Sequence, residues 1–349
     1  MNPEVWSLIG EKFALSGALV LVALVVAMYS TWAERKVAAY IQDRRGPARA
    51  GWGGLVQPLA DGGKLFFKEE ITPKHSDKFL FILGPTVAMT LSLMTGAVIP
   101  WSSEFQWGDR VINPLIADIN VGYLYVLGII SLGAYGVLLG SWGSNNKWSL
   151  MGGLRSASQI ISYELPLGLS LIAVFMISGS LKLNVIVEQQ MDGYWNIILQ
   201  PLGFLIFLIC MFAETNRTPF DLPEAENELI GGFHSEYSSM KLGFFLFSDY
   251  VHMFIASVIL STIYFGGYDI PFVNDAQLTE SLGMNIMAIL HFLVLFTKTC
   301  MFIFFFMWVR WTIPRFRYDQ LMDLGWKRLL PLSLFNLLIT GFIILYFFN

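Results

Sequence analysis

Long apolar stretches separated by shorter polar ones dominate the pattern of this chain. About eight of these stretches approach or exceed the roughly 20 residues that a helix needs to cross a bilayer. The predicted spans are 13–33, 79–99, 122–142, 160–180, 194–214, 242–265, 284–311 and 329–348. The pattern therefore predicts an all-α polytopic membrane protein, folded as a single membrane domain over residues 1–349.

Composition supports this class. Hydrophobic residues make up 55% of the 349 residues and charged residues 14%, and the mean hydropathy is +0.58; such values are typical of membrane proteins. The first apolar stretch is too long for the core of a signal peptide and runs directly into Glu34-Arg35-Lys36. We expect it to be the first transmembrane helix.

The basic residues predict an orientation, because cytoplasmic loops of membrane proteins are enriched in Lys and Arg. Of the 22 Lys and Arg residues, all but four lie in or beside the loops 34–78, 143–159, 215–241 and 312–328. The exceptions are Lys12, Arg110, Lys182 and the intramembrane Lys298. These four loops are therefore expected to be cytoplasmic, with both termini on the outer side.

The loop that follows the fifth predicted span is unusually acidic. Its sequence, AETNRTPFDLPEAENELIGGFHSEYSSMK (213–241), opposes six acids to Arg217 and Lys241. The acids are Glu214, Asp221, Glu224, Glu226, Glu228 and Glu236. Two prolines rule out a continuous helix through its start, and apolar residues such as Phe220 and Phe233 are interleaved with the acids. A solvated tether seldom carries so much apolar surface, so we expect a packed loop that places carboxylates near a cavity.

The first cytoplasmic loop contains a short helical pattern. Gln57, Asp61, Lys64 and Lys68 recur at steps of four, three and four, which places them on one polar stripe. One interpretation is an amphipathic helix that lies on the membrane surface with its lysines facing lipid headgroups. The other is a helix whose stripe lines a site, which would explain the acid among the lysines. The pattern alone leaves both open.

Several ionisable residues fall inside the predicted spans. They are Glu164, Glu214, Asp249, His252, His291 and Lys298. A charge at the bilayer centre costs about 2.5–3.5 kcal/mol, so such residues usually face a bundle interior or water. Partly desolvated carboxylates have raised pKa values and can relay protons, although each one can instead make a structural hydrogen bond. The histidines lack metal-ligand spacing and are expected to be packed or hydrogen-bonded.

Several chemistries lack a motif. The chain has neither a P-loop nor a dinucleotide-binding glycine pattern, and no cysteine or histidine spacing typical of a cluster or haem. Cys210 and Cys300 lie in apolar segments, so a structural disulfide is not expected. We therefore expect no metal, no redox centre and no nucleic-acid partner for this chain.

Five stretches carry a family resemblance. They are ERKVAAYIQDRRGP (34–47), GLVQPLADGGKLFFKE (54–69), RSASQIISYE (155–164), AETNRTPFDLPEAENEL (213–229) and MWVRWTIPRFRYDQLMDLGWK (307–327). From about residue 34 to 327 the sequence resembles the H subunit of proton-translocating NADH–quinone oxidoreductase, respiratory complex I, which is called subunit 1 in mitochondria. The family has eight spans with outside termini, in agreement with the spans predicted above.

The resemblance implies a bacterial plasma-membrane subunit, with periplasmic termini, that forms much of a quinone-binding tunnel and couples quinone reduction to proton translocation. FMN and iron–sulfur clusters would belong to partner subunits of the peripheral arm. Antiporter-like membrane subunits, quinone and membrane lipid would be the other partners. No residue of this chain is expected to be catalytic.

The resemblance also assigns residues to these roles. Together with the stripe and the loop aromatics, the expected quinone-tunnel residues are Glu34, Arg35, Arg44, Gln57, Asp61, Lys64, Arg217, Phe220, Glu224, Glu226, Glu228, Phe233, Arg310, Arg315 and Arg317. The expected proton-coupling residues are Glu164, Glu214, Glu236, Asp249 and Lys298. Two departures stand out: Asp249 replaces a Glu common among relatives, and Ala48 and Ala50 replace Asn and Val.

Two alternatives use the same pattern. The first is the homologous membrane subunit of a membrane-bound hydrogenase or formate hydrogenlyase, which would use the fold without quinone. The cytoplasmic loops resemble those that bind quinone in the complex I family, which argues against this alternative. The second is a free-standing cation transporter with intramembrane carboxylates, which should show internal repeats and interrupted helices in matching halves. The sequence shows neither.

Overall fold

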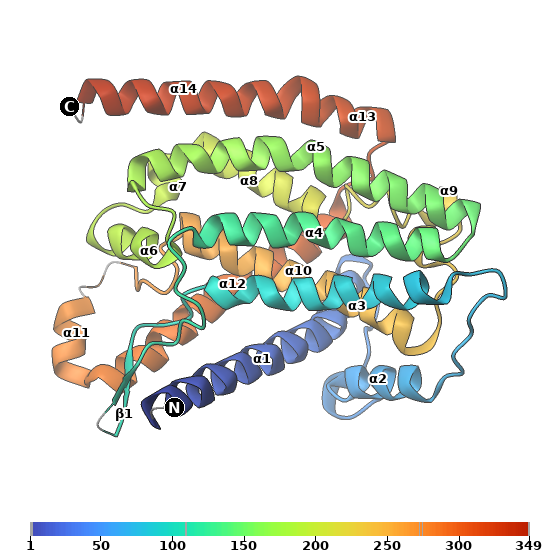
Figure 1. Cartoon of the computed structure of the whole chain (residues 1–349), viewed down its shortest axis with the longest axis horizontal. Coiled ribbons are helices and arrows are strands. Elements are labelled where there is room, and N and C mark those ends of the chain that lie inside the picture. The colour runs from blue at the N-terminus through green and yellow to red at the C-terminus, as the bar shows by residue number, and fades with distance from the viewer. Residues whose placement is uncertain (1–2, 109, 272, 274, 348–349) are drawn as a thin grey trace.

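The computed structural model describes residues 3–108, 110–271, 273 and 275–347. Some helical side chains, including that of Glu226, lie outside the described set. The long helices are α1 (Pro3–Ile41), α3 (Lys78–Met94), α4 (Gly122–Gly143), α5 (Lys147–Ser178), α10 (Ser239–Tyr264), α12 (Met284–Thr312) and α14 (Leu330–Phe347). They run roughly parallel or antiparallel in one bundle (Figure 1). The predicted all-α polytopic class is confirmed.

Shorter elements join the long helices. The α-helices among them are α2 (Gln57–Phe67), α6 (Leu183–Asp192), α7 (Asn196–Leu199), α8 (Pro201–Glu214), α9 (Glu226–Leu229), α11 (Asp275–Leu282) and α13 (Tyr318–Asp323). Tighter or wider turns occur at η1 (Trp52–Gly54), η2 (Thr95–Val98), η3 (Gly232–His234) and the π-helical η4 (Leu324–Leu329). Strands β1 (Phe105–Trp107) and β2 (Arg110–Ile112) form an antiparallel hairpin in which Gln106 pairs with Val111.

Within the described residues, seven helices are long and apolar enough to cross a membrane, and the eighth predicted span differs. In place of one helix over 194–214, the structure has α7, a break at Gln200 and the 14-residue α8. Gln200 adopts φ −132° and ψ 57°, outside the helical region. The break lies next to Pro201, which has no N–H to continue a helix and suits a first helical position.

The packing of α3 against α4 depends on glycine. A Cβ atom on Gly84 would lie 2.5 Å from the Cα of Gly140, and one on Gly136 would lie 2.8 Å from the backbone of Ala88. Small residues allow helix backbones to approach closely where no water drives their association. The two helices accordingly lie side by side along most of their length (Figure 1).

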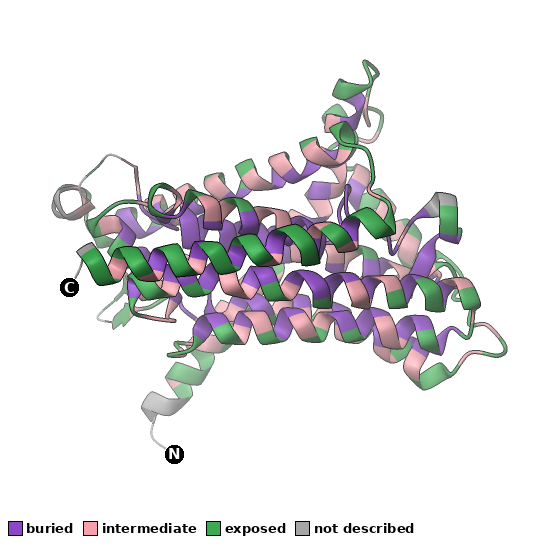
Figure 2. Cartoon of the chain, turned by 90° about the horizontal axis from the view of Figure 1, so that it is seen from above, coloured by how far each residue is buried: buried purple, intermediate pink, exposed green. Residues whose placement is uncertain are grey.

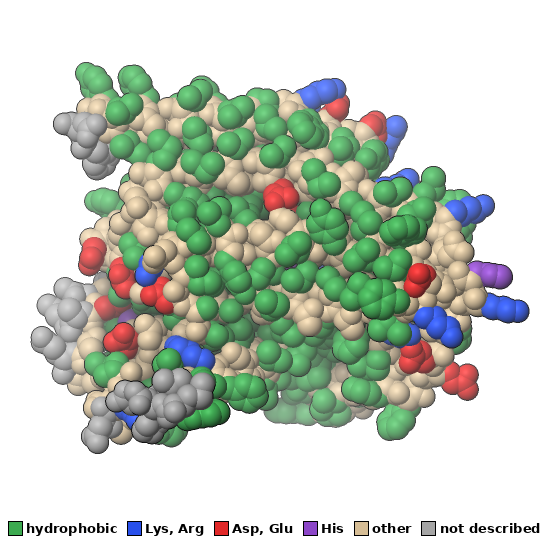
Figure 3. All heavy atoms as spheres, in the orientation of Figure 1, with side chains coloured by type: hydrophobic (Ala, Val, Ile, Leu, Met, Phe, Trp, Pro, Cys, Tyr) green, Lys and Arg blue, Asp and Glu red, His purple; other side chains and the backbone are tan. Residues whose placement is uncertain are grey.

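Helix α10 lies at the centre of the bundle and is the most buried of the long helices; from Met253 to Tyr264 every residue is buried. By contrast, α14 exposes residues such as Leu338 (68%) and Phe342 (67%) on the outside, as Figure 2 shows. Apolar side chains cover the flank of the bundle seen in Figure 3, and Lys and Arg side chains cluster where α2, α9 and α13 lie. We call that end the basic end, and the opposite end, which carries β1, β2 and α11, the hairpin end.

Candidate functional site at the basic end

A cavity of about 440 Å³ opens beside α1 at the basic end. Helices α1, α2, α10 and α12 contribute its walls. Its charged lining residues are Glu34, Arg35, Arg44, Asp61, Lys64 and Lys68, and its apolar ones include Met28, Ala38, Leu65, Leu246, Phe247 and Trp311. The volume lies within the roughly 300–1,000 Å³ of small-molecule sites. The cavity therefore suits a ligand that is part polar and part apolar.

Glu34 is the centre of the charge network behind this cavity. Its Oε1 lies 2.7 Å from Nη1 of Arg310, and its Oε2 accepts a hydrogen bond of 2.9 Å from the hydroxyl of Tyr250. Nη1 of Arg217 donates to the same Oε2 at 3.4 Å. Glu34 is only 6% exposed, so one carboxylate compensates two guanidinium groups in a setting with little water.

Arg217 retains unused hydrogen-bonding capacity. Its guanidinium carbon lies 4.2 Å from the centre of the Tyr250 ring, a cation–π contact. Among the described atoms, Nε and Nη2 are buried without a hydrogen-bond partner. A buried donor left unsatisfied costs about 1–3 kcal/mol, which favours a water or ligand oxygen at these atoms. Arg217 stands behind Glu34 and Tyr250, which line the cavity.

The polar stripe of α2 faces the same cavity. Arg35 and Asp61 form an ion pair of 2.8 Å, and Nε2 of Gln57 donates to the other Asp61 oxygen at 2.9 Å. Asp61, Lys64 and Lys68 line the cavity. Between the two interpretations of the stripe, the structure favours a helix that lines a site.

A basic groove adjoins the cavity. It has a volume of about 740 Å³. Its lining residues are Arg35, Arg44, Arg45, Gly46, Pro47, Ala48, Arg49 and Gln57. Arg35 and Arg44 line both the cavity and the groove. The groove therefore extends the cavity, and all of its charged lining residues are positive. Ala48, one of the two departures from the family pattern in this loop, lies in its wall.

The acidic loop is packed, as expected, and its aromatics anchor it. Phe220 is 3% exposed and lies 5.4 Å, centre to centre, from the rings of both Tyr163 and Phe316. Phe233 is 2% exposed and contacts Phe245 edge-on at 5.2 Å. Both are expected tunnel residues, but neither lines the cavity beside α1. They hold the loop in place.

Two acids of this loop, the buried Asp221 and the half-buried Glu224, lie near the network. Asp221 pairs with Arg315 at 2.7 Å, yet burial and the neighbouring Glu224 raise its pKa to about 6. Burial also raises the pKa of Glu224, against the opposing effect of Arg217 and Arg310. Both carboxyls therefore hold a proton more tightly than an exposed carboxyl does.

The remaining predicted tunnel residues lie farther out. Glu228 is half-exposed and pairs with Arg155 at 2.6 Å. Arg317 is exposed and pairs with Asp319 at 3.2 Å. The side chain of Glu226 lies outside the described residues. The structure thus gathers Glu34, Arg217 and Arg310 with Glu224, and separates Glu228 and Arg317 from them.

The predicted proton-coupling residues fall into separate places. Glu214, 2% exposed, and Asp249 line a small cavity of about 40 Å³ together with His252. That space accommodates a few water molecules. In the described part of the chain, Oε1 of Glu214 and Nε2 of His252 have no hydrogen-bond partner, which is where such water would bind.

Glu164 and Glu236 have other neighbours. Glu164 accepts a hydrogen bond from Ser131, between α4 and α5. Glu236 accepts one from Asn146 at the start of α5. The structure thus places neither carboxylate on the wall of the small cavity.

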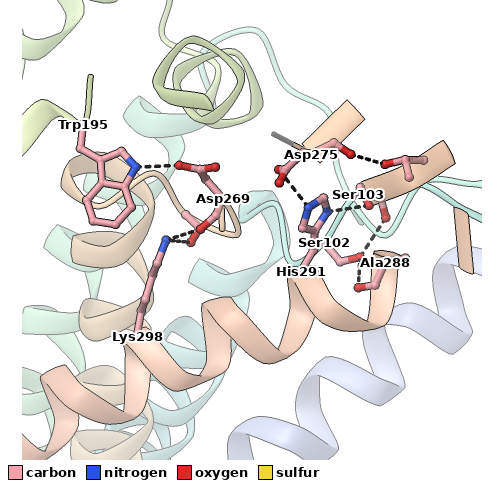
Figure 4. A network of polar contacts seen from close by, with 10 residues as sticks. Ser102, Ser103, Trp195, Asp269, Asp275, Ala288, His291 and Lys298 are labelled. Carbon is pink, nitrogen blue, oxygen red and sulfur yellow. Dashed lines mark hydrogen bonds and ion pairs between the residues drawn. The ribbon is translucent and has the colours of Figure 1, made fainter. Parts of the chain in front are cut away.

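Lys298 lies toward the hairpin end (Figure 4). Its ammonium donates to the backbone carbonyls of Phe265, Gly267 and Asp269 at 2.7, 3.0 and 2.7 Å. Phe265 follows Asp249 by 16 positions along α10, which at the rise of a helix is about 24 Å. The structure therefore separates Lys298 from Glu214 and Asp249, the residues with which the resemblance groups it.

His291 belongs to the same region (Figure 4). Its Nδ1 lies 2.8 Å from Oγ of Ser103 and its Nε2 3.1 Å from the Asp275 carboxylate. It is thus hydrogen-bonded, in line with the expectation for the intramembrane histidines.

Tyr250 is the residue of this candidate site that the sequence did not predict. It lies in a predicted span directly after Asp249, and a hydroxyl beside an intramembrane acid was the available signal. Its role depends on contact with Glu34, 216 positions away. Within the described residues, no group of three His, Cys, Asp or Glu side chains is placed to hold a metal ion.

Fold and site define an all-α, multi-pass membrane protein with a charge-lined cavity at one end of its bundle. Residues 14–341 match the NADH dehydrogenase family. The chain is 57% identical over 335 residues to the H subunit of the NADH-quinone oxidoreductase of Flavobacterium johnsoniae, covering 96% of this chain and 95% of that protein. It is also 57% identical over 337 residues to an H subunit of the NADH-quinone oxidoreductase of Cytophaga hutchinsonii (97% of both chains). It is 45% identical over 337 residues to NADH-quinone oxidoreductase subunit 8 of Rhodothermus marinus (94% of both). The chain belongs to the NADH dehydrogenase family.

Proposed function

We propose that this chain is the membrane subunit of a proton-translocating NADH–quinone oxidoreductase and that the cavity beside α1 binds the quinone. The observation that carries the proposal is the lining of that cavity, where Glu34, Arg35 and Asp61 meet apolar residues such as Phe247 and Trp311. The partners would be a peripheral arm that holds FMN and iron–sulfur clusters, and antiporter-like membrane subunits. The membrane would be the bacterial plasma membrane, with both termini periplasmic.

The mixed lining suits a ligand with a polar head and an apolar tail. Burying the carbonyl groups of the head without partners costs roughly 1–3 kcal/mol each, so a wholly apolar cavity would exclude them. The cations that line the cavity, such as Arg35, Arg44 and Lys64, supply donors, and the partly unsatisfied Arg217 lies behind them. Carboxylates at Glu34 and Asp61 keep the local charge balanced. The apolar wall leaves room for the tail.

The loop carboxyls offer a route for coupling to protons. Glu224 lies close enough to Arg217, Glu34 and Asp249 for each to affect its pKa. Asp249 in turn lines the small cavity that it shares with Glu214. We infer that protons move between Glu224, Asp249 and Glu214 in response to charge at the quinone. Glu164 lies close enough to Glu214 to interact with it electrostatically, although it does not line the small cavity. Glu236 and Lys298 remain in the proposed coupling set, but they lie away from this segment.

Arg217→Ala tests the quinone site. Loss of this cation removes a charge partner from the carboxylate of Glu34 on the cavity wall and should raise the KM for a short-chain quinone about tenfold or more, which is about 1.4 kcal/mol or more. The matched control is Lys74→Ala, which truncates an exposed cation of the same end and should leave KM unchanged. Equal, negligible effects of both variants in an assembled complex would contradict the assignment of the cavity.

Glu214→Gln tests the coupling route. Gln keeps the volume and a hydrogen-bonding head but cannot ionise, so NADH–quinone activity and proton pumping should fall well below wild type. NADH oxidation by an artificial acceptor at the flavin should continue, because that reaction bypasses the membrane. Near-normal quinone reduction with full pumping would remove Glu214 from the mechanism.

Purification of the tagged chain from its native membrane tests the assembly. A component of the proposed complex should bring flavin and iron–sulfur clusters with it. A free-standing transporter would purify without them. An assembly that contains a hydrogenase metal centre and lacks quinone reductase activity would favour the alternative of a hydrogenase or formate hydrogenlyase subunit.

A further inference from the structure

An apolar groove at the hairpin end lies outside the proposed quinone and proton sites. Its volume is about 470 Å³. One wall is the face of α1 formed by Leu15, Ala18, Leu19 and Val22, and the opposite wall is the face of α12 formed by Asn285, Ala288, Ile289 and Phe292. Both sets follow the helical spacing i, i+3, i+4, i+7. The groove is therefore the space between two helices that face each other over two turns.

The segment around the hairpin closes the groove at its outer end. Trp101, Phe105 and Trp107 line it there, together with Pro114 and Ile116. The backbone N–H of Gln106 donates to Oδ1 of Asn285 at 2.7 Å, which ties β1 to the start of α12. The hairpin, α12 and the first turns of α1 lie together in Figure 1. Tryptophans at this position are typical of the membrane–water interface.

We propose that this groove binds one acyl chain of a phospholipid from the membrane leaflet at the hairpin end. Residues 15–22 and 285–292 each cover about 10 Å of helix, about a third of the roughly 30 Å hydrocarbon core. Their rims are open: Ala18 and Ile289 are both exposed. A space open sideways at this depth of a membrane protein is filled by hydrocarbon or by protein.

Its shape favours hydrocarbon over a helix. A helix with its side chains is 10–12 Å across, whereas this groove is the space between two helix faces and is closed at one end by the hairpin segment. An acyl chain is narrower. The hairpin also blocks the long path that a second transmembrane helix would need along α1 and α12.

The rim carries charges that suit a phosphate headgroup. Lys12 lies one turn before Leu15, and its ammonium donates to the carbonyl of Leu115 at 2.7 Å, next to the lining residue Pro114. Glu11 lies 3.7 Å from the same ammonium and offsets part of its charge. Exposed Arg110 pairs across the hairpin with Trp107, another lining residue. Cations near the headgroup level attract anionic phosphates. The apolar groove thus suits the acyl chain of a phospholipid, and the cations at its rim suit the phosphate of the headgroup.

The experiment uses the native membrane assembly, purified in detergent through a tag on this chain and incubated with a probe lipid. The probe is a phosphatidylcholine whose acyl chain carries a diazirine. Loosely held lipid is removed by extensive detergent washing before photolysis, and adducts are mapped by mass spectrometry. In the wild type we expect adducts on 15–22 and 285–292 to exceed those on the exposed face of α14 about tenfold, which corresponds to about 1.4 kcal/mol of preferential binding.

Ala18→Trp fills the groove from its exposed rim, and adducts on 285–292 should fall about tenfold, or about 1.4 kcal/mol. The matched control is Ala14→Trp, an exposed position one turn earlier that does not line the groove; it should keep them. If the Ala18→Trp variant does not assemble, Ile289→Trp replaces it, with Leu293→Trp as its control. The adducts on residues 15–22 are then measured, and only Ile289→Trp should lower them. Wild-type adducts no higher than on α14, adducts on a partner chain seated in the groove, or equal losses in filling and control variants would each overturn the proposal.

Discussion

Two cations inside the bundle, the buried Arg217 at the basic end and the half-buried Lys298 toward the hairpin end, are satisfied in opposite ways. Lys298 has three donors, and three backbone carbonyls that follow α10 accept them. Arg217 has five donors, of which only Nη1 is used, on a carboxylate that it shares with Arg310. Nε and Nη2 are buried without a partner among the described atoms.

The difference shows that burial of a charge does not by itself indicate function. Lys298 is saturated by main chain and also faces the ring of Trp195 at 4.6 Å, so it fastens α12 to the loop after α10. Arg217 is compensated in charge but not saturated in hydrogen bonds, and it stands behind the wall of a 440 Å³ cavity. Arg217 therefore still has hydrogen-bond donors to offer, whereas Lys298 has none.

The largest effect on stability is expected from Glu34→Gln. This change leaves the buried Arg217 and the partly exposed Arg310 without their shared carboxylate; breaking a buried ion pair costs about 3–5 kcal/mol. The measurement is the assembled yield and thermal stability of the complex from membranes. An assembled complex with wild-type stability would show that the network is not the centre of the site.

Lys298→Met should have a smaller effect. Met retains most of the side-chain volume but leaves three carbonyls without their donor, which should destabilise the protein by about 2–3 kcal/mol. Thermal unfolding of the complex measures this loss. The KM for short-chain quinone should remain at the wild-type value, and a rise like that expected for Arg217→Ala would erase the contrast between the two cations.

Asp61→Asn should affect binding more than stability. The ion pair with Arg35 is partly exposed, with 35% and 55% of the two side chains accessible, and such pairs contribute about 0–1 kcal/mol. Because Asp61 lines the cavity, we expect a KM for quinone that rises by about threefold, or less than about 1 kcal/mol. Kinetics at several quinone concentrations test this. A stability loss as large as that of Glu34→Gln would indicate a structural role instead.

Asp319→Asn should have the smallest effect of these substitutions on stability and on quinone binding. Its partner Arg317 is 77% exposed and Asp319 66%, and substitutions at such surface positions usually change stability by less than about 0.5 kcal/mol. Both thermal stability and quinone KM should equal wild type. A clear change in KM would return Arg317 to the quinone site, where the family resemblance places it.

Much of the fold follows from local sequence, and less of the site does. Seven of the predicted spans coincide with long helices, but Pro201 divides the other one. The polar stripe on α2 was visible from its spacing, and the structure places Asp61 and Lys64 on the cavity wall. Phe220 carried no such signal, because a loop aromatic has the same sequence pattern whether it lines a cavity or packs against Tyr163.

The sequence by itself determined which segments are apolar enough to enter a membrane, because the cost of burying each side chain in hydrocarbon depends on that side chain and its near neighbours. It also determined which residue types were available for a charged site. Only the tertiary structure decided their partners. Glu34 meets Arg217 across 183 positions and Tyr250 across 216, and Lys298 meets the end of α10 instead of Glu214. Those pairings depend on how the helices pack. The spacing of side chains along one helix does not predict which helix lies beside it.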